Sequence, residues 1–314
     1  MVARRGIAGI DVVRAGDRVR RTVQLRDLRV STLTLHRYRE ALQSFLFFCM
    51  LMFGGLAPDL DTLDCHAVDY VESLWEEFES KGSASTALAA IQHFLGRRRC
   101  LPRAWHLLST WNLYDLPGRA PPLPADLLYA LVGKALLEDK PGLAAGLALG
   151  FAAFLRTGEL LQVQYRHFQL SNIGGILALP LTKTGRRQGH QEMVPLEDAI
   201  SLQLLWRCAA ASLPTDTVMP TGAVFRKWWA EAMTEFGLDP ELWRPYSIRR
   251  GGASHHFRRG GDLAATLFRG RWSSVTTARG YLVEGLALLA QLTVNVRTVP
   301  RGVLYLETLR SALN

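Results

Sequence analysis

The sequence RWSSVTTARGY, residues 271–281, begins with an arginine and a tryptophan and ends on Tyr281, nine positions after Trp272. Just before it, YSIRRGGASHHFRRGG, residues 246–261, carries four arginines in sixteen positions. Arg249 falls in the first turn of a predicted helix, where unpaired backbone N–H groups add positive potential. Because guanidinium groups bind phosphate oxygens in pairs, this pattern predicts an anion site around the tyrosine.

The composition is that of a globular protein, with 314 residues, 48% of them hydrophobic and 21% charged. This length allows one large domain or two of ordinary size. The formal net charge is +9, and arginine supplies most of the positive excess. Such an excess favours a nucleic-acid partner, and the alternative is a basic protein without one.

Cysteines and apolar runs give no sign of metal, disulfide or membrane. The four cysteines have no paired spacing, which predicts neither a zinc site nor a disulfide framework: Cys49, Cys65, Cys100 and Cys208. Reduced thiols in an intracellular compartment are expected, with bacterial cytoplasm and nucleus both open. The N-terminus does not resemble a secretory signal. The most apolar run, residues 142–155, is too short to span a bilayer and predicts a buried helix.

The first part of the chain is predicted to be helical. Residues 1–24 carry six arginines against two aspartates and predict a basic N-terminal arm. Residues 25–114 predict a compact four-helix module, whose first helix begins at Thr34 as its cap. The other helices are expected over 60–78, 83–95 and 103–114. The basic stretch GRRRCLPR, residues 96–103, either faces a phosphate backbone or forms a solvated turn.

A proline-rich connector divides the chain. DLPGRAPPLP, residues 115–124, has four prolines in ten positions and cannot continue a helix. Residues 125–314 then predict a second domain made mostly of helices. Within it, two short apolar runs flank a polar tip over residues 174–196, which indicates an antiparallel hairpin. The predicted fold class is therefore mainly α with one small antiparallel sheet.

Each candidate site residue has a structural alternative. Arg156 is predicted at the end of an apolar helix, where an ion pair with Glu159 would explain it. Lys183, near the hairpin tip, would ordinarily be solvated. Trp272 and Tyr281 would ordinarily be packing residues, the latter inside a helix that continues beyond it.

Taken in order, these segments resemble the catalytic domain of the tyrosine recombinases and integrases. The segments are FLRTGELL (154–161), LTKTG (181–185), YSIRRGGASH (246–255) and RGRWSSVTTARGY (269–281). The resemblance covers residues 25–300 and implies a SAM-like core-binding domain ahead of the connector. It assigns the catalytic positions to Arg156, Lys183, Arg249, Trp272 and Tyr281.

One position departs from the family's pattern. Where the family usually has the histidine of His-x-x-Arg, this chain has Tyr246. A phenol there can donate a hydrogen bond to phosphate or hold the incoming hydroxyl group. It would be a poor base near pH 7 unless nearby guanidinium groups lowered its pKa from the usual value of about 10.

The resemblance implies that the Tyr281 hydroxyl attacks a DNA phosphate, which forms a 3′-phosphotyrosyl bond and frees a 5′-hydroxyl. Arg156 and Arg249 would stabilise the charge on the non-bridging oxygens, with the indole N–H of Trp272 as a further donor. Lys183 would protonate the departing 5′-oxygen. No carboxylate cluster suggests a magnesium site, and no metal or cofactor is required.

The expected partners are double-stranded DNA and further copies of the chain, and no membrane role is predicted. The tail VLYLETLRSALN, residues 303–314, is predicted to dock on a neighbouring subunit and form a tetramer on DNA, or else to dock on its own domain. Its apolar stripe would comprise Val303, Leu306, Leu309 or Arg310, and Leu313. The leading functional hypothesis is an active recombinase. The alternatives are a DNA-binding protein with reduced or lost catalysis and a type IB topoisomerase.

Overall fold

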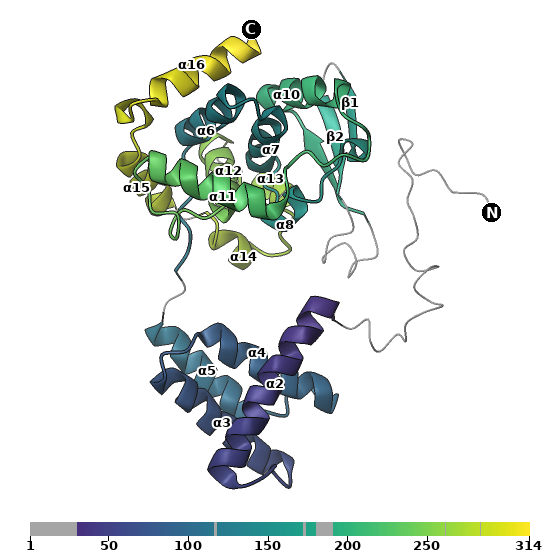
Figure 1. The fold of residues 1–314 in the computed structure, drawn as a ribbon, viewed down its shortest axis with the longest axis vertical. Coiled ribbons are helices and arrows are strands. Elements are labelled where there is room, and N and C mark those ends of the chain that lie inside the picture. The colour runs from purple at the N-terminus through teal and green to yellow at the C-terminus, as the bar shows by residue number, and fades with distance from the viewer. Residues whose placement is uncertain (1–29, 116–117, 172–173, 180–190, 261, 283) are drawn as a thin grey trace, which may run out of the picture. The chain divides into compact units, whose positions relative to one another are not determined.

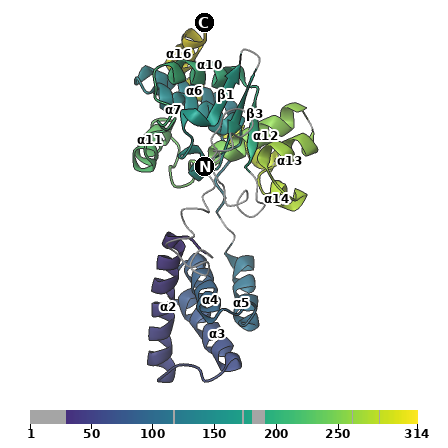
Figure 2. The same cartoon turned by 90° about the vertical axis from the view of Figure 1, so that its right-hand side faces the viewer.

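The computed structural model describes residues 30–115, 118–171, 174–179, 191–260, 262–282 and 284–314. These residues divide into two compact units, one ending at Gly118 and the other beginning at Arg119 (Figures 1 and 2). Each unit has its own hydrophobic core. Across the described ranges, no helix combines the length and the apolar character needed to cross a membrane.

The described part of the N-terminal unit consists of α2 (Thr32–Phe53), α3 (Leu60–Glu76), α4 (Lys81–Leu95) and α5 (Pro102–Tyr114). The first helix begins at Thr32, two residues before the predicted start. The reason is its cap: Ser31, not Thr34, accepts a first-turn N–H, with 3.2 Å between Ser31 Oγ and Thr34 N. The inward faces of all these helices share one core, which includes Phe45, Tyr70, Leu88, Leu101 and Trp111.

The C-terminal unit is built around two helices, α6 (Ala125–Leu137) and α7 (Pro141–Ala152). Every residue of α7 from Leu143 to Phe151 is buried, as its apolar sequence predicted. The other helices of the unit are α8 (Thr157–Leu160), η3 (Tyr165–His167), α10 (Ala199–Ala210), α11 (Gly222–Glu235), α12 (Tyr246–Gly260), α13 (Leu263–Gly270), α14 (Val275–Arg279), α15 (Glu284–Thr293), η4 (Val296–Thr298) and α16 (Gly302–Leu313).

α12 approaches the end of α7 closely because glycine lies at the crossing. A Cβ atom at Gly252 would lie 2.0 Å from the carbonyl oxygen of Phe151, so no larger residue fits without a shift of the backbone. This contact places the first turn of α12 beside the chain that leaves α7.

Three described strands form one antiparallel sheet in the order β1 (Phe168–Ser171), β2 (Gly174–Ala178) and β3 (Met193–Leu196). The predicted hairpin corresponds to β2 and β3, with Leu177 opposite Val194. β1 was not predicted, because its four residues are too few to show a clear alternation. The predicted mainly α fold with a small antiparallel sheet is confirmed.

The second half of the predicted connector is held by the C-terminal unit. Leu123 N donates to the carbonyl of Ser247 at 3.0 Å. Arg250 Nη1 donates to the carbonyl of Ala120 at 2.8 Å. The residues from Ala120 to Pro124 are buried, so they belong to the packing of this unit.

The C-terminal helix α16 packs along α6 of the same chain (Figure 1). Tyr305 is buried, and its hydroxyl donates to Glu235 Oε1. In this single chain the helix docks on its own domain, which is the second of the two predicted arrangements. The predicted stripe is partly wrong, because Val303 is exposed and Tyr305 takes its place beside Leu309.

Candidate active site

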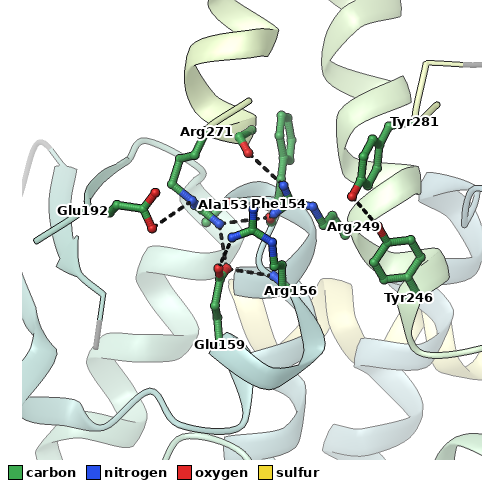
Figure 3. A network of polar contacts seen from close by, with 10 residues as sticks. Ala153, Phe154, Arg156, Glu159, Glu192, Tyr246, Arg249, Arg271 and Tyr281 are labelled. Carbon is green, nitrogen blue, oxygen red and sulfur yellow. Dashed lines mark hydrogen bonds and ion pairs between the residues drawn. The ribbon is translucent and has the colours of Figure 1, made fainter. Parts of the chain in front are cut away.

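The predicted site residues that the structure describes come together from four segments of the C-terminal unit. Figure 3 shows those on three of the segments, Arg156, the pair Tyr246 and Arg249, and Tyr281. Arg156 lies at the start of α8, Tyr246 and Arg249 in the first turn of α12, Trp272 after α13, and Tyr281 after α14. Lys183 lies outside the described residues, between β2 and β3.

The prediction that Arg156 ends the apolar helix is wrong. Arg156 is instead the N-cap residue of the next helix, α8. α7 stops at Ala152, and Phe154 has a left-handed backbone with φ of 47°, which a continuing helix cannot contain. The predicted alternative, an ion pair with Glu159, is also present. Arg156 Nη1 lies 2.5 Å from Glu159 Oε1, and the Arg156 backbone N donates to Glu159 Oε2 at 2.9 Å. The Arg156 side chain remains 37% exposed, so part of the guanidinium is open to a ligand.

Arg249 is fully buried in the same region. Its two terminal nitrogens donate to backbone carbonyls, Nη1 to Phe154 and Nη2 to Gly270, the latter at 2.8 Å. The guanidinium lies under two aromatic rings, 5.1 Å from the centroid of Trp272 and 5.3 Å from that of Tyr281. Burial, followed by the charges of neighbouring arginines, lowers the pKa of Arg249 to about 10, which leaves it protonated at neutral pH.

The prediction that Tyr281 lies inside a helix is wrong. Tyr281 lies in the turn between α14 and α15. Its backbone is fixed from both sides. Tyr281 N donates to the carbonyl of Ala278 at 2.8 Å, and its own carbonyl accepts from Ser254 Oγ at 3.2 Å. Leaving the helix turns the side chain toward α12 instead of along the packed face of α15.

The hydroxyl of Tyr246 donates a hydrogen bond to the hydroxyl of Tyr281 (Figure 3). Burial raises the pKa of Tyr281, but the hydrogen bond from Tyr246 and the charge of Arg249 outweigh it, so the net pKa lies below its usual value of 10.0. Burial and the hydrogen bond to Tyr281 raise the pKa of Tyr246. Tyr246 therefore stays protonated as a donor, while Tyr281 is the easier of the two phenols to ionise.

Trp272 packs beside the ring of Tyr281. Its ring centroid lies 4.6 Å from that of Tyr281, and the side chain is largely buried against Phe154. Within the described residues, Trp272 Nε1 has no hydrogen-bond partner of ordinary length. This nitrogen is itself buried, and the indole N–H contributes to the lowered pKa of Tyr281.

Three charged residues of the site were not predicted as site residues: Glu159, Glu192 and Arg271. Burial raises the pKa of Glu159, but the guanidinium groups of Arg271 and Arg156 outweigh it, so the net pKa is lowered and the carboxylate stays ionised. Glu159 lies in the segment FLRTGELL that contains Arg156, and Arg271 lies in the segment RGRWSSVTTARGY that contains Trp272. Their pairing joins positions 112 apart in the sequence, and no local period reveals such a contact.

No group of three or more histidine, cysteine, aspartate or glutamate side chains that could hold a metal ion occurs within the described ranges. The cationic character of the site comes instead from its arginines. Together with the two phenols and the indole, these groups can bind an anion and deliver an oxygen nucleophile to it.

No protein-family model matches the sequence, and no curated protein matches it either. Solved structures do match. The Tn1549 transposon integrase in complex with transposon right end DNA has a TM-score of 0.61 at 12% identity, over 84% of this chain and 95% of that one. The XerH site-specific recombinase, bound to palindromic difH substrate in a post-cleavage complex, has a TM-score of 0.54 at 15% identity, over 83% and 79%.

The same recombinase in its pre-cleavage complex gives a TM-score of 0.53 at 15% identity, over 79% of this chain and 76% of that one. Likeness at such low identity shows the fold. This chain has the tyrosine recombinase fold, and the resemblance predicted from its motifs is confirmed at that level.

Proposed function

We propose that this chain is a site-specific DNA recombinase or integrase that cuts and rejoins DNA through a covalent bond to Tyr281. The observation that carries the proposal is the hydrogen bond from Tyr246 to the Tyr281 hydroxyl beside the Arg249 guanidinium. These contacts support the assignment of Tyr281 as an activated phenol in a cationic site, on a fold shared with proteins named as recombinases and integrases. The partner is double-stranded DNA, and the anion is one of its phosphates.

Tyr281 is the nucleophile, and Tyr246 assists it as a hydrogen-bond donor. A hydrogen bond donated to a phenolate stabilises the charged form, and so does a nearby guanidinium. In the cleavage step Tyr281 loses its phenolic proton to solvent and its oxygen bonds to phosphorus. The bond between phosphorus and the 5′-oxygen breaks, and that oxygen gains a proton. The 3′-phosphotyrosyl bond conserves the energy needed for rejoining.

The arginines stabilise the charge that builds on the non-bridging oxygens, each such donor being worth on the order of 10²–10³ in rate. Arg156 is the open one, and it makes the first contact with the phosphate. Arg249 lies beneath the ring of Tyr281, so the phosphate reaches it as that ring moves to its attacking position. Trp272 Nε1 supplies a further donor. Lys183 protonates the leaving oxygen, a role assigned from its place in the sequence.

Two features favour a second candidate, a DNA-binding protein on the same fold with reduced or lost catalysis. Tyr246 occupies the place of the usual histidine, and the terminal nitrogens of Arg249 are both engaged by backbone carbonyls. Covalent trapping separates the two candidates, because only the active protein forms an adduct.

The test uses a duplex with a nick just downstream of the cleavage site. The short fragment that carries the new 5′-hydroxyl then diffuses away, and the adduct accumulates. The wild-type protein should form an adduct that survives boiling in detergent. Tyr281→Phe should bind the same DNA equally well and form none, since only one oxygen is removed. Tyr129→Phe, elsewhere in the same unit, is the matched control and should retain the adduct. An undiminished adduct with Tyr281→Phe would place the nucleophile elsewhere.

The proposed assembly is a tetramer on two DNA sites, as the resemblance implies. Strand exchange between two duplexes would support recombination. Relaxation of supercoiled DNA by a monomer, without exchange, would support the topoisomerase alternative.

A further inference from the structure

Arg271 is held in an unfavourable backbone conformation. It follows α13 with φ of 55°, a left-handed value that is unfavourable for a residue other than glycine. Its side chain is only 8% exposed. A long cationic side chain keeps such a position only where its surroundings hold it, and those surroundings are polar groups of the active site.

The Arg271 guanidinium joins three segments of the chain (Figure 3). Its Nη2 lies 2.7 Å from Glu159 Oε2 on α8. Its Nε lies 3.9 Å from Glu192 Oε2, just before β3. The same guanidinium donates to the carbonyls of Ala153 and Phe154, at 3.3 and 3.4 Å, in the turn between α7 and α8. Arg271 therefore braces the turn from which Arg156 projects.

Glu159 divides its two oxygens between two arginines. Oε2 accepts from Arg271 and from the backbone N of Arg156, while Oε1 accepts from Arg156 Nη1. Without Arg271, the whole carboxylate would be free to turn onto Arg156 and neutralise it. With Arg271 in place, Arg156 commits one terminal nitrogen to the protein and keeps the rest of its fork for a ligand.

The charges point the same way. In the described cluster the guanidinium groups of Arg156, Arg249 and Arg271 outnumber the carboxylates of Glu159 and Glu192 by one. Removing Arg271 would lower the positive charge of this cluster by one and so weaken its attraction for an anion.

We propose that Arg271 is a positioning residue for the phosphate-binding fork of Arg156. It holds Glu159 so that Arg156 stays both charged and oriented toward the scissile phosphate. This proposal rests on the function proposed above. It gives Arg271 no direct contact with DNA, and its effect passes through Arg156.

The test compares two variants that separate charge from geometry. Arg271→Lys keeps the charge but loses the fork that reaches both glutamates and both carbonyls. Arg271→Gly loses the charge but relieves the left-handed backbone, so it is the variant least prone to misfold. Cleavage is measured in single turnover at saturating nicked DNA. One substrate has an ordinary scissile phosphate, and the other has an uncharged methylphosphonate in its place.

On ordinary DNA, Arg271→Lys should slow cleavage by about 10–10², the scale of a small misplacement of a catalytic group. Arg271→Gly should slow it by about 10²–10³, as loss of the Arg156 contact itself would. On the methylphosphonate, where there is less charge to stabilise, both variants and Arg156→Ala should recover to within a few-fold of wild type. DNA affinity and thermal unfolding are measured alongside.

Arg269→Lys is the matched control. Arg269 lies in the last turn of α13, two residues before Arg271. It also pairs with a glutamate and a backbone carbonyl, Glu197 at 2.6 Å and Ala152 at 3.2 Å, but it has no contact with Glu159 among those described. It should cleave both substrates like wild type.

Equal defects of the Arg271 variants on the two substrates, while Arg156→Ala recovers, would show general damage and overturn the proposal. Wild-type cleavage that depends on Tyr281 reports the proposed function separately. Its complete absence would overturn both proposals.

Discussion

At the scale of single residues, the site depends on a pair of phenols with opposite pKa shifts. Tyr246 is the donor whose pKa is raised, and Tyr281 is the acceptor whose pKa is lowered. A histidine in place of Tyr246 would also offer a donor to the Tyr281 hydroxyl. The departure from the family's pattern therefore keeps a hydrogen bond to the Tyr281 hydroxyl, which we propose is the nucleophile, while removing a group that titrates near neutral pH.

The pair predicts a pH effect. Ionised Tyr281 is the reactive form, so the cleavage rate should rise with pH toward the pKa of Tyr281. Tyr246→Phe removes the hydrogen bond that lowers this pKa, so the rise should move to higher pH and the rate at pH 7 should fall. Tyr246→His, which restores a donor, should move the profile back. Single-turnover rates between pH 6 and about 9 measure it. A profile that Tyr246→Phe leaves in place would show that Tyr246 does not activate Tyr281.

Lys183 has its own prediction, based on its position in the sequence and on the chemistry of the leaving group. Lys183→Ala should slow cleavage of ordinary DNA by about 10²–10⁴, the usual span for a general acid. Sulfur in place of the bridging 5′-oxygen leaves without a proton, so the variant should then recover most of its rate. Arg156→Ala should not recover on this substrate. Equal defects of Lys183→Ala on both substrates would assign the lysine to phosphate positioning only.

Order and spacing along the chain could identify the catalytic candidates, because the motifs are local. They could not identify the partners of those residues. Arg271 reaches Glu159 and Glu192 only after α13, α8 and the sheet have packed together. Nor could spacing show that Arg249 is buried beneath Tyr281, since burial depends on the turn that follows α14.

At the scale of elements, the existence of the helices was predictable and their interruptions were not. An apolar run shows no period that marks where α7 ends, and the left-handed backbone of Phe154 has no sequence signature. The end of α14 likewise has no signature in the sequence. Both breaks lie at the active site, where they place Arg156 and Tyr281. Helical periodicity in the sequence thus predicts the helices, whereas the candidate site residues Arg156 and Tyr281 lie where that periodicity is interrupted.

The packing of α16 on α6 is tight enough to test directly. A Cβ atom at Gly133 would lie 1.8 Å from the carbonyl oxygen of Tyr305. Gly133→Ala should therefore lower the free energy of unfolding by about 1–3 kcal/mol, as overpacking usually does. Gly285→Ala is the control, since a Cβ there meets nothing within 4 Å and should be neutral or slightly stabilising. Denaturant unfolding measures both. Equal stability of the two variants would mean that α16 does not rest on Gly133.

At the scale of the whole molecule, the described residues form two units with separate cores. The proline-rich connector was readable because proline excludes helix whatever the tertiary context. The packing of the second half of this connector against α12 could not be predicted from the sequence. The hydrogen bonds that hold it join Ala120 and Leu123 to residues more than a hundred positions away.

The position of α16 matters for assembly. Truncation after Gly302 removes Tyr305 and Leu309 from the core, so the protein should unfold at lower denaturant concentration. If α16 also passes between subunits on DNA, the truncated protein should bind a single site but form no tetramer on paired sites. Light scattering of the complexes measures their mass. Tetramers of the truncated protein would rule out α16 as the exchanged element.

The central claim is that Tyr281 becomes covalently joined to DNA, and identifying the bond itself tests it most directly. Nicked DNA labelled at either end is trapped with the protein, the complex is digested with protease, and the DNA-linked peptide is identified by mass spectrometry. The account predicts one peptide containing Tyr281, joined to the 3′ phosphate of the cut strand, with a free 5′-hydroxyl on the released fragment. Attachment at any other residue, a 5′-phosphate linkage, or no adduct at saturating binding would contradict it.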